Sequence, residues 1–464
     1  MPPYQKGQPR GIAPTKINPT MKSLIFTIII CVLFILETLV LTNAINCCGI
    51  YASPIIFLCI SLAMAVVAMG GGVLWLPSDT DKAAIPANEP TNLPHKTRDW
   101  TAILFASNAF ILLLWYGSRR FADVPIDPNM SDVFPQVLSA ARWFMQGEYA
   151  YQIVTLPSYQ MNNTYLPMQW LPFCLSEYVG KDPRWIPLLS WGISILALIY
   201  GLQTRLQTAI SGQRMLFIGL GLLLPFWAVY AFIRHNTVDY GLTLELLPAS
   251  YYIWLCVGLL SGSAWVIGLA LGACLLSRFS ILFFIPFLVY YVVQVYGKQK
   301  ARLVAGIVTG FILCVFVLPF MTHDLQLPSK IVGNYNNGTL AEWKGQAWQE
   351  AGSEPHQLAR GTGMAIYFKK WFEPDLMRGI EWLKRTEILL CLLATLGVYG
   401  LYRRYGQRLA NGQWLLLGGL KLYFVFFYHF ILIPYPYLFL MPMSISAVLV
   451  LKATTEMEGR ALTS

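Results

Sequence analysis

Three aspartates, Asp123, Asp127 and Asp132, lie within ten positions of one another in a segment rich in proline and aromatic residues. An ionised carboxylate that is sheltered from water can remove a proton from a hydroxyl and accelerate a reaction by about 10²- to 10⁴-fold. Apolar residues recur at helical spacing over 133–144, and Ser131 is placed as the N-cap. Asp132 then falls in the first turn, where the helix dipole favours a carboxylate. Asp132 could therefore act as a general base, or it could simply cap this helix.

The alternative for each aspartate is structural. Asp132 would cap its helix, and Asp127 would hold a turn beside proline. If Asp127 also acts on substrate, it supplies a second carboxylate beside Asp132. Asp127 and Asp132 together could also hold a divalent metal. The sequence has no Cys/His cluster with zinc spacing and no glycine-rich phosphate loop, so we expect no cofactor and no use of a nucleotide sugar.

Basic side chains that could bind a phosphate occur near three predicted helix ends: Arg278, the pair Arg234 and His235, and His323. Arginine suits bidentate contacts with phosphate, and histidine could contact phosphate or relay a proton. In the alternative, each arginine reaches lipid headgroups or pairs with a carboxylate, and His323 is a simple hydrogen-bonding group. The candidate carboxylates for such pairing are Asp239 and Glu245.

The elements that must position these side chains are membrane helices. The chain has 464 residues, of which 56% are hydrophobic and only 12% charged, whereas soluble domains carry about 25% charged residues. This composition excludes a cytosolic enzyme, a secreted domain and a receptor with one anchor. Apolar runs long enough to span a bilayer number about twelve, so we predict an all-α polytopic membrane protein. One run, 262–296, is interrupted at Ser277 and Arg278 and is predicted to form two short helices.

Lysine and arginine are concentrated in alternate short loops, which predicts that both termini are cytoplasmic. The net charge of +10 is then mainly an orientation signal, and we expect no nucleic-acid partner. The long segments 118–184 and 322–385 both fall outside. The predicted organisation is a disordered tail (1–21), an N-terminal two-helix hairpin and cytoplasmic loop (22–99), a transmembrane core with a first outside loop (100–321), a long interfacial outside loop (322–385) and the C-terminal helices (386–464).

Two charged residues lie inside predicted spans. We expect Glu37 to find its partner within the N-terminal hairpin. Lys421 is either functional or a side chain whose charged end reaches the interface.

The first outside loop continues from Asp132 through Gly147-Glu148-Tyr149 to Tyr165-Leu166-Pro167 and then Leu171-Pro172-Phe173. This pattern resembles the first extracytoplasmic loop of the GT-C class of membrane glycosyltransferases, and is most similar to bacterial mannosyltransferases that use polyprenyl-phosphate sugars. The resemblance implies that Asp132 is the catalytic aspartate and that Gly147 and Tyr149 end the interfacial helix. It also implies that Tyr165 and Pro167 begin the return into the membrane.

A second stretch, 268–286, looks like the later pair of helices that this class breaks at a basic residue, here Arg278. The sequence RHNTVDYG after Ile233 departs from the class, in which a Gly-Gln pair is more usual, and the N-terminal hairpin is an addition. The resemblance implies a GT-C fold with Tyr149, Tyr165 and Gln169 near the substrate.

We therefore expect a multi-pass enzyme of the bacterial inner membrane. It would transfer a hexose or pentose from a polyprenyl-phosphate donor to a lipid, glycan or protein acceptor on the extracytoplasmic face, with inversion. Two rivals remain. A secondary transporter or lipid flippase would place charges along a midplane path, and a ligase-type membrane transferase would also need cations near a lipid phosphate.

Overall fold

The computed structural model describes residues 19–74, 100–157, 160–203, 212–345, 357–406 and 409–461. Nearly all of the predicted N-terminal tail and the predicted loop near residues 77–98 lie outside these ranges. The described chain is helical apart from one small hairpin, in which β1 (Ile153–Thr155) pairs antiparallel with β2 (Gln160–Asn162). This architecture agrees with the predicted all-α membrane protein.

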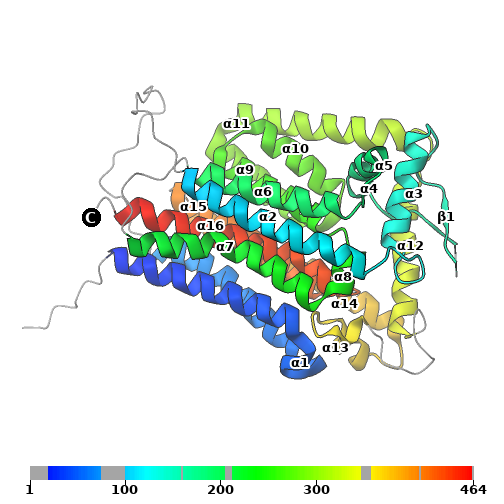
Figure 1. Ribbon diagram of the computed structural model, residues 1–464, viewed down its shortest axis with the longest axis horizontal. Coiled ribbons are helices and arrows are strands. Elements are labelled where there is room, and N and C mark those ends of the chain that lie inside the picture. The colour runs from blue at the N-terminus through cyan, green and yellow to red at the C-terminus, as the bar shows by residue number, and fades with distance from the viewer. Residues whose placement is uncertain are drawn as a thin grey trace, which may run out of the picture.

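Long helices form a bundle (Figure 1). They are α1 (Pro19–Leu74), α2 (Trp100–Asp123), α6 (Trp185–Gln203), α7 (Gly212–His235), α9 (Leu246–Ser261), α10 (Ala264–Leu275), α11 (Ile285–Ile312), α14 (Leu376–Tyr405), α15 (Leu409–His429) and α16 (Leu440–Ala461). Seven helical segments of the described chain are long and apolar enough to cross a membrane, and three shorter apolar helices accompany them. Helix α1 joins two of these segments across a kink with non-helical backbone at Asn43 and Gly49.

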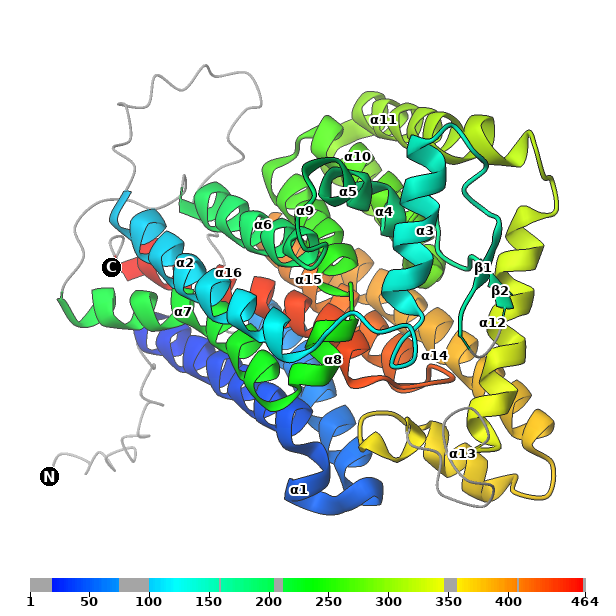
Figure 2. The same ribbon diagram turned by 45° about the vertical axis from the view of Figure 1, so that its right-hand side comes forward.

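The shorter elements are α3 (Val133–Met145), α4 (Pro167–Trp170), η1 (Leu171–Phe173), α5 (Cys174–Val179), α8 (Thr237–Leu242), η2 (Phe279–Phe284), η3 (Leu313–Met321), α12 (Leu327–Trp343), η4 (Leu358–Arg360), α13 (Ala365–Trp371) and η5 (Pro436–Phe439). In both ribbon views, α3 and α12 run across one end of the bundle, with the hairpin and α13 at the same end (Figures 1 and 2). The start of α1 and the end of α16 lie at the opposite end. The described parts of 118–184 and 322–385, which were both predicted to lie outside the membrane, therefore meet at one end of the molecule.

The run 262–296 is broken at the predicted place, and it forms two short helices as predicted: α10, and the part of α11 that precedes Gly297. Helix α10 ends at Leu275, the backbone at Arg278 is extended (φ −149°, ψ 144°), and η2 leads into the 28-residue α11. Helix α11 continues past a second break at Gly297, where φ is +83°. The predicted run therefore ends one residue before this second break.

The N-terminal hairpin packs on the end of the chain. Glu37 on α1 forms a buried ion pair with Lys421 on α15, and the two residues are 1% and 0% exposed. The carboxylate also accepts hydrogen bonds from Ser61 and Ser446, both at 2.6 Å, and Lys421 donates to the Pro442 carbonyl at 3.1 Å. The prediction that Glu37 finds its partner within the hairpin is confirmed for the hydrogen bond from Ser61. It is wrong for the ion pair, because the cation is Lys421 on α15.

Candidate functional site

Helix α3 begins one residue later than predicted, with Asp132 rather than Ser131 at the N-cap. The Ser131 hydroxyl accepts from the Val133 N–H at 3.3 Å, so it holds a local turn before the helix. The Asp132 carboxylate makes no capping hydrogen bond to α3 within the described structure. The alternative role of this carboxylate, capping its own helix, is therefore not observed.

The other end of α3 closes as predicted at Gly147. Its φ of +77° is favourable only for glycine. The N–H groups of Gly147 and Glu148 bond to the carbonyls of Phe144 and Trp143 at 3.1 and 2.8 Å, which is a Schellman motif. Tyr149 follows, and its ring centroid lies 6.0 Å from that of His323.

These two predicted site residues are distant from Asp132. Helix α3 has 13 residues, so its ends are separated by about 20 Å. Asp132 stands at one end, and Tyr149 with the exposed His323 at the other. The pKa of the Tyr149 hydroxyl is raised by burial and by the nearby Asp324 carboxylate.

The segment that returns into the bundle is anchored to three neighbours. Buried Gln136 on α3 accepts from the Thr164 N–H and hydroxyl, both at 3.3 Å. The Met168 N–H donates to the Leu276 carbonyl at 3.0 Å, and the Met168 carbonyl accepts from the Tyr251 hydroxyl at 2.9 Å. These bonds fix Tyr165 and Gln169 between α3, α9 and the end of α10.

Arg278 projects from the break after α10 and forms an ion pair with Glu245, which precedes α9. The Glu245 side chain is 3% exposed and the Arg278 side chain 22%. Pairing with Glu245 was the structural alternative for Arg278, and it is observed. It does not saturate either group, because Glu245 Oε2 and Arg278 Nε are buried with no hydrogen-bond partner in the described structure.

The charge states of this pair follow from burial and mutual attraction. Burial raises the pKa of the Glu245 carboxyl above its usual value, and Arg278 counteracts part of the rise. Burial alone would lower the pKa of Arg278, but Glu245 outweighs it and the net pKa is raised. Arg278 is therefore a permanent cation.

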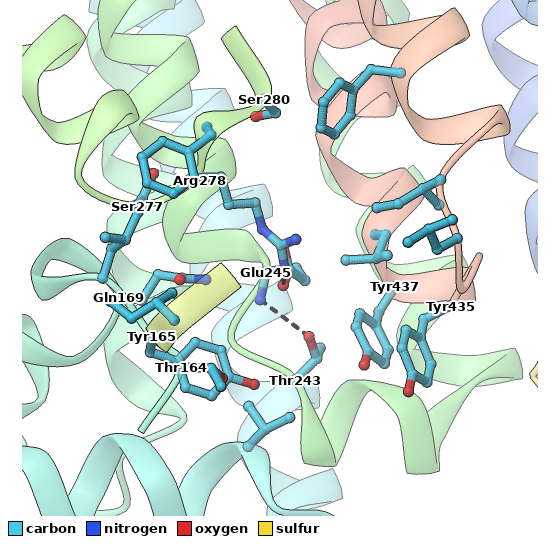
Figure 3. Close-up of a pocket in the computed structure, with 18 of the residues that line it drawn as sticks. Thr164, Tyr165, Gln169, Thr243, Glu245, Ser277, Arg278, Ser280, Tyr435 and Tyr437 are labelled. Carbon is cyan, nitrogen blue, oxygen red and sulfur yellow. Dashed lines mark hydrogen bonds and ion pairs between the residues drawn. The ribbon is translucent and has the colours of Figure 1, made fainter. Parts of the chain in front are cut away.

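A pocket of about 370 Å³ opens around this pair (Figure 3), a size that suits a small-molecule ligand. Its polar lining residues come from five separated parts of the chain, and they are Thr164, Tyr165, Gln169, Thr243, Glu245, Ser277, Arg278, Ser280, Lys384, Glu387, Tyr435 and Tyr437. Val133, the neighbour of Asp132, also lines it. Three predicted site residues, Tyr165, Gln169 and Arg278, thus meet in one cavity.

Tyr165 connects Asp132 to this pocket. Burial raises the pKa of the Tyr165 hydroxyl well above its usual value, and the negative charges of Asp132 and Glu245 add to the rise, while Arg278 opposes it. Asp132 does not line the pocket, but it lies within electrostatic range of Tyr165, and its chain neighbour Val133 is a lining residue.

The remaining predicted residues are elsewhere. Arg234 and His235 are exposed at the end of α7 and do not line this pocket. Asp127 Oδ1 accepts from the N–H and the side-chain amide of Asn129, both at 2.9 Å, as expected for a turn residue. In the described chain, no group of three or more His, Cys, Asp or Glu side chains could hold a metal ion. A metal held by Asp127 and Asp132 alone stays a prediction.

Glu245, Tyr435 and Tyr437 are among the pocket residues that were not selected from the sequence. Glu245 appeared there only as a candidate partner for an arginine, inside a run taken as a plain span, and Tyr435 and Tyr437 were included in the last span. The available signal was Pro434-Tyr435-Pro436-Tyr437, because prolines at alternate positions interrupt a regular α-helix. The structure has the short turn η5 at this place.

No known family model matches the chain, and neither a curated protein nor a solved structure is significantly similar to it.

Proposed function

We propose that the protein is an integral-membrane glycosyltransferase of GT-C type that uses a polyprenyl-phosphate-linked sugar. The observation that carries the proposal is the pocket in which Arg278, Tyr165 and Gln169 meet beside Asp132. A permanent cation with an unsatisfied donor lines the pocket, and an aspartate at a helix start lies within electrostatic range of the lining residue Tyr165. They provide one group for a phosphate and one for a hydroxyl proton.

In this mechanism, the acceptor hydroxyl oxygen attacks the anomeric carbon, and the bond from that carbon to the phosphate oxygen breaks. Asp132 takes the hydroxyl proton, and the phosphate leaves with the bonding electrons. Arg278 stabilises the charge that develops on the phosphate. Direct displacement inverts the anomeric centre. Asp127 is occupied in its own turn, which favours the single-base scheme over a retaining scheme with two carboxylates.

The topology belongs to the same proposal. The seven long segments and the three shorter helices give ten spans. Counting α15 as a span, and counting 279–321 as two spans separated at Gly297, brings the total to about twelve. Both termini would be cytoplasmic, in a bacterial inner membrane. The pocket would open at the extracytoplasmic face, where the donor and a lipid, glycan or protein acceptor meet.

A transporter or flippase is less well supported. That class needs charges that line a path across the bundle. The ion pair deepest in this bundle, Glu37 and Lys421, is closed off by its serine and carbonyl partners. A ligase-type transferase would also use Arg278 to bind a lipid phosphate. It differs from the proposed glycosyltransferase only in the product that it forms.

The test is transfer from polyprenyl-phosphate sugars by purified protein in micelles. We expect Asp132→Asn to lower the rate by about 10²- to 10⁴-fold while donor binding is retained. Asp127→Asn is the matched control, because its carboxylate lies in a turn nearby, and its transfer rate should stay near that of the wild type. Full activity in Asp132→Asn would exclude Asp132 as the base, and a polymeric product would favour the ligase.

A further inference from the structure

The wall of the pocket opposite Arg278 is a pair of stacked tyrosines. The rings of Tyr435 and Tyr437 are 5.0 Å apart between centroids and inclined by only 9°. Both side chains are partly exposed and line the cavity (Figure 3). Aromatic pairs that only fill a core are normally buried, so this pair presents aromatic surface to whatever occupies the pocket.

The backbone that carries the two rings is rigid. Pro434 and Pro436 fix φ on either side of Tyr435, and the N–H groups of Tyr435 and Leu438 bond to the carbonyls of Ile433 and Tyr435, both at 3.0 Å. A neighbouring loop fastens the segment from outside. The Thr362 hydroxyl donates to the Pro434 carbonyl at 2.6 Å, and the Met364 N–H donates to the His429 carbonyl at 2.7 Å.

This loop contacts the tyrosine segment so closely that only glycine fits at its centre. A Cβ atom at Gly363 would lie 2.3 Å from Pro434 Cβ. Two separate stretches of chain therefore determine where the rings stand. Such rigidity lowers the entropy lost when a ligand stacks on them.

Across the cavity from the rings lie polar and charged groups. Glu245, Thr243 and Tyr165 face the tyrosines in the close-up (Figure 3). The Tyr437 hydroxyl is within electrostatic range of Glu245 and Asp132. The pocket is thus apolar and flat on one side and rich in hydrogen-bonding groups on the other.

A sugar ring has this same division. One face of a hexopyranose presents C–H groups, which the electron-rich face of an aromatic ring attracts, and its hydroxyls need polar partners. An isoprenoid chain would not use the polar wall, and a phosphate would not use the aromatic one.

We propose that Tyr435 and Tyr437 form the subsite for the hexopyranose ring of the donor. This inference rests on the proposed function. It places the sugar between the tyrosines and Glu245, with its phosphate at Arg278 and its anomeric carbon toward Asp132.

The experiment compares two lipids that differ only in the sugar: polyprenyl phosphate and polyprenyl-phosphate hexose. We expect Tyr437→Leu to weaken binding of the sugar-bearing lipid by about tenfold and to change binding of the sugar-free lipid by less than about twofold. Tyr437→Phe keeps the ring and should bind both lipids nearly as the wild type does. Tyr405→Leu, an exposed position on α14, is the matched control and should alter neither affinity.

Tyr435→Leu provides a second test if Tyr437→Leu does not fold, because it removes the other ring of the stack and should give the same selective loss. Equal losses for the two lipids, or no loss for either, would overturn the sugar subsite while leaving the proposed function intact. If the wild-type protein binds neither lipid, the proposed function fails and the subsite with it.

Discussion

Two ion pairs in the described part of the chain have opposite characters. In the first, Glu37 and Lys421 join α1 to α15, and two serines and a backbone carbonyl complete their hydrogen bonds. In the second, Glu245 and Arg278 pair beside a cavity of about 370 Å³ and keep two buried atoms without partners. One pair is complete within the protein, whereas the other has capacity left for a ligand.

The difference teaches how to distinguish structural charge from functional charge inside a membrane bundle. Burial does not distinguish them, because three of the four side chains are almost fully buried. The unsatisfied hydrogen-bonding atoms do, since an orphaned buried polar atom weakens a fold by about 1 to 3 kcal/mol unless something binds to it. Four experiments test this comparison.

The largest effect is expected from Lys421→Met. It leaves the Glu37 carboxylate buried without a counter-charge, so the free energy of unfolding should fall by about 3 to 5 kcal/mol. Denaturant titration in mixed micelles, followed by circular dichroism, measures this loss. The double variant Glu37→Gln with Lys421→Met should recover much of it, because no buried charge remains. A double variant as unstable as the single would show that charge is not the cause.

Arg278→Gln should affect ligand binding more than stability. Glu245 already has a raised pKa through burial, so it can take up a proton when its partner is lost. Binding of polyprenyl phosphate should weaken by about 10- to 100-fold, as expected for loss of charge-assisted hydrogen bonds. The control is Arg234→Gln, an exposed arginine outside the pocket. Equal weakening in both variants would mean that the phosphate contact is not specific to Arg278.

Ser446→Ala should weaken the structural pair by a smaller amount. It removes one donor to the buried Glu37 carboxylate, which is expected to lower the free energy of unfolding by about 1.5 to 3 kcal/mol. Thr455→Ala on the same helix is the control, because the Thr455 hydroxyl bonds to carbonyls of its own helix. If both variants lose the same stability, the bond to Glu37 is not special.

The smallest effect is a pH dependence that belongs to the Glu245 pair. Because its folded pKa is raised, the carboxyl contributes stability that is fully present below its unfolded pKa and is lost as pH rises through the folded pKa. Glu245→Gln does not titrate at this position. The melting temperature of the wild type relative to Glu245→Gln should therefore decrease from acid toward neutral pH. A constant difference would contradict the raised pKa.

Part of the candidate site could be predicted from the sequence because charge is rare in apolar runs. Arg278 interrupts a span, and Asp132 precedes a short amphipathic helix, so both were visible as local exceptions. Gly147 was selected through the resemblance, and its positive φ does end α3. The break after α10 and the start of α3 were accordingly predicted to within a few residues.

What could not be predicted is which outside segments are neighbours. His323 and Arg234 satisfied the same criteria as Arg278, but they lie at the far end of α3 and at the end of α7. The partnership of Glu37 with Lys421 depends on α1 packing against α15, which no local pattern encodes. Glu245, Tyr435 and Tyr437 lie inside predicted spans, and only tertiary packing brings them to the pocket of Arg278.

The hydrogen-bonding scheme around Glu37 has a consequence for how the chain is made. Lys421 follows Glu37 by 384 positions, which a ribosome covers in about 20 to 80 s. During that time the carboxylate is already in the first hairpin without its cation. Ser61 follows by only 24 positions, so it is the first partner to arrive. During biosynthesis, Ser61 would donate a hydrogen bond to the Glu37 carboxylate until Lys421 emerges near the end of translation.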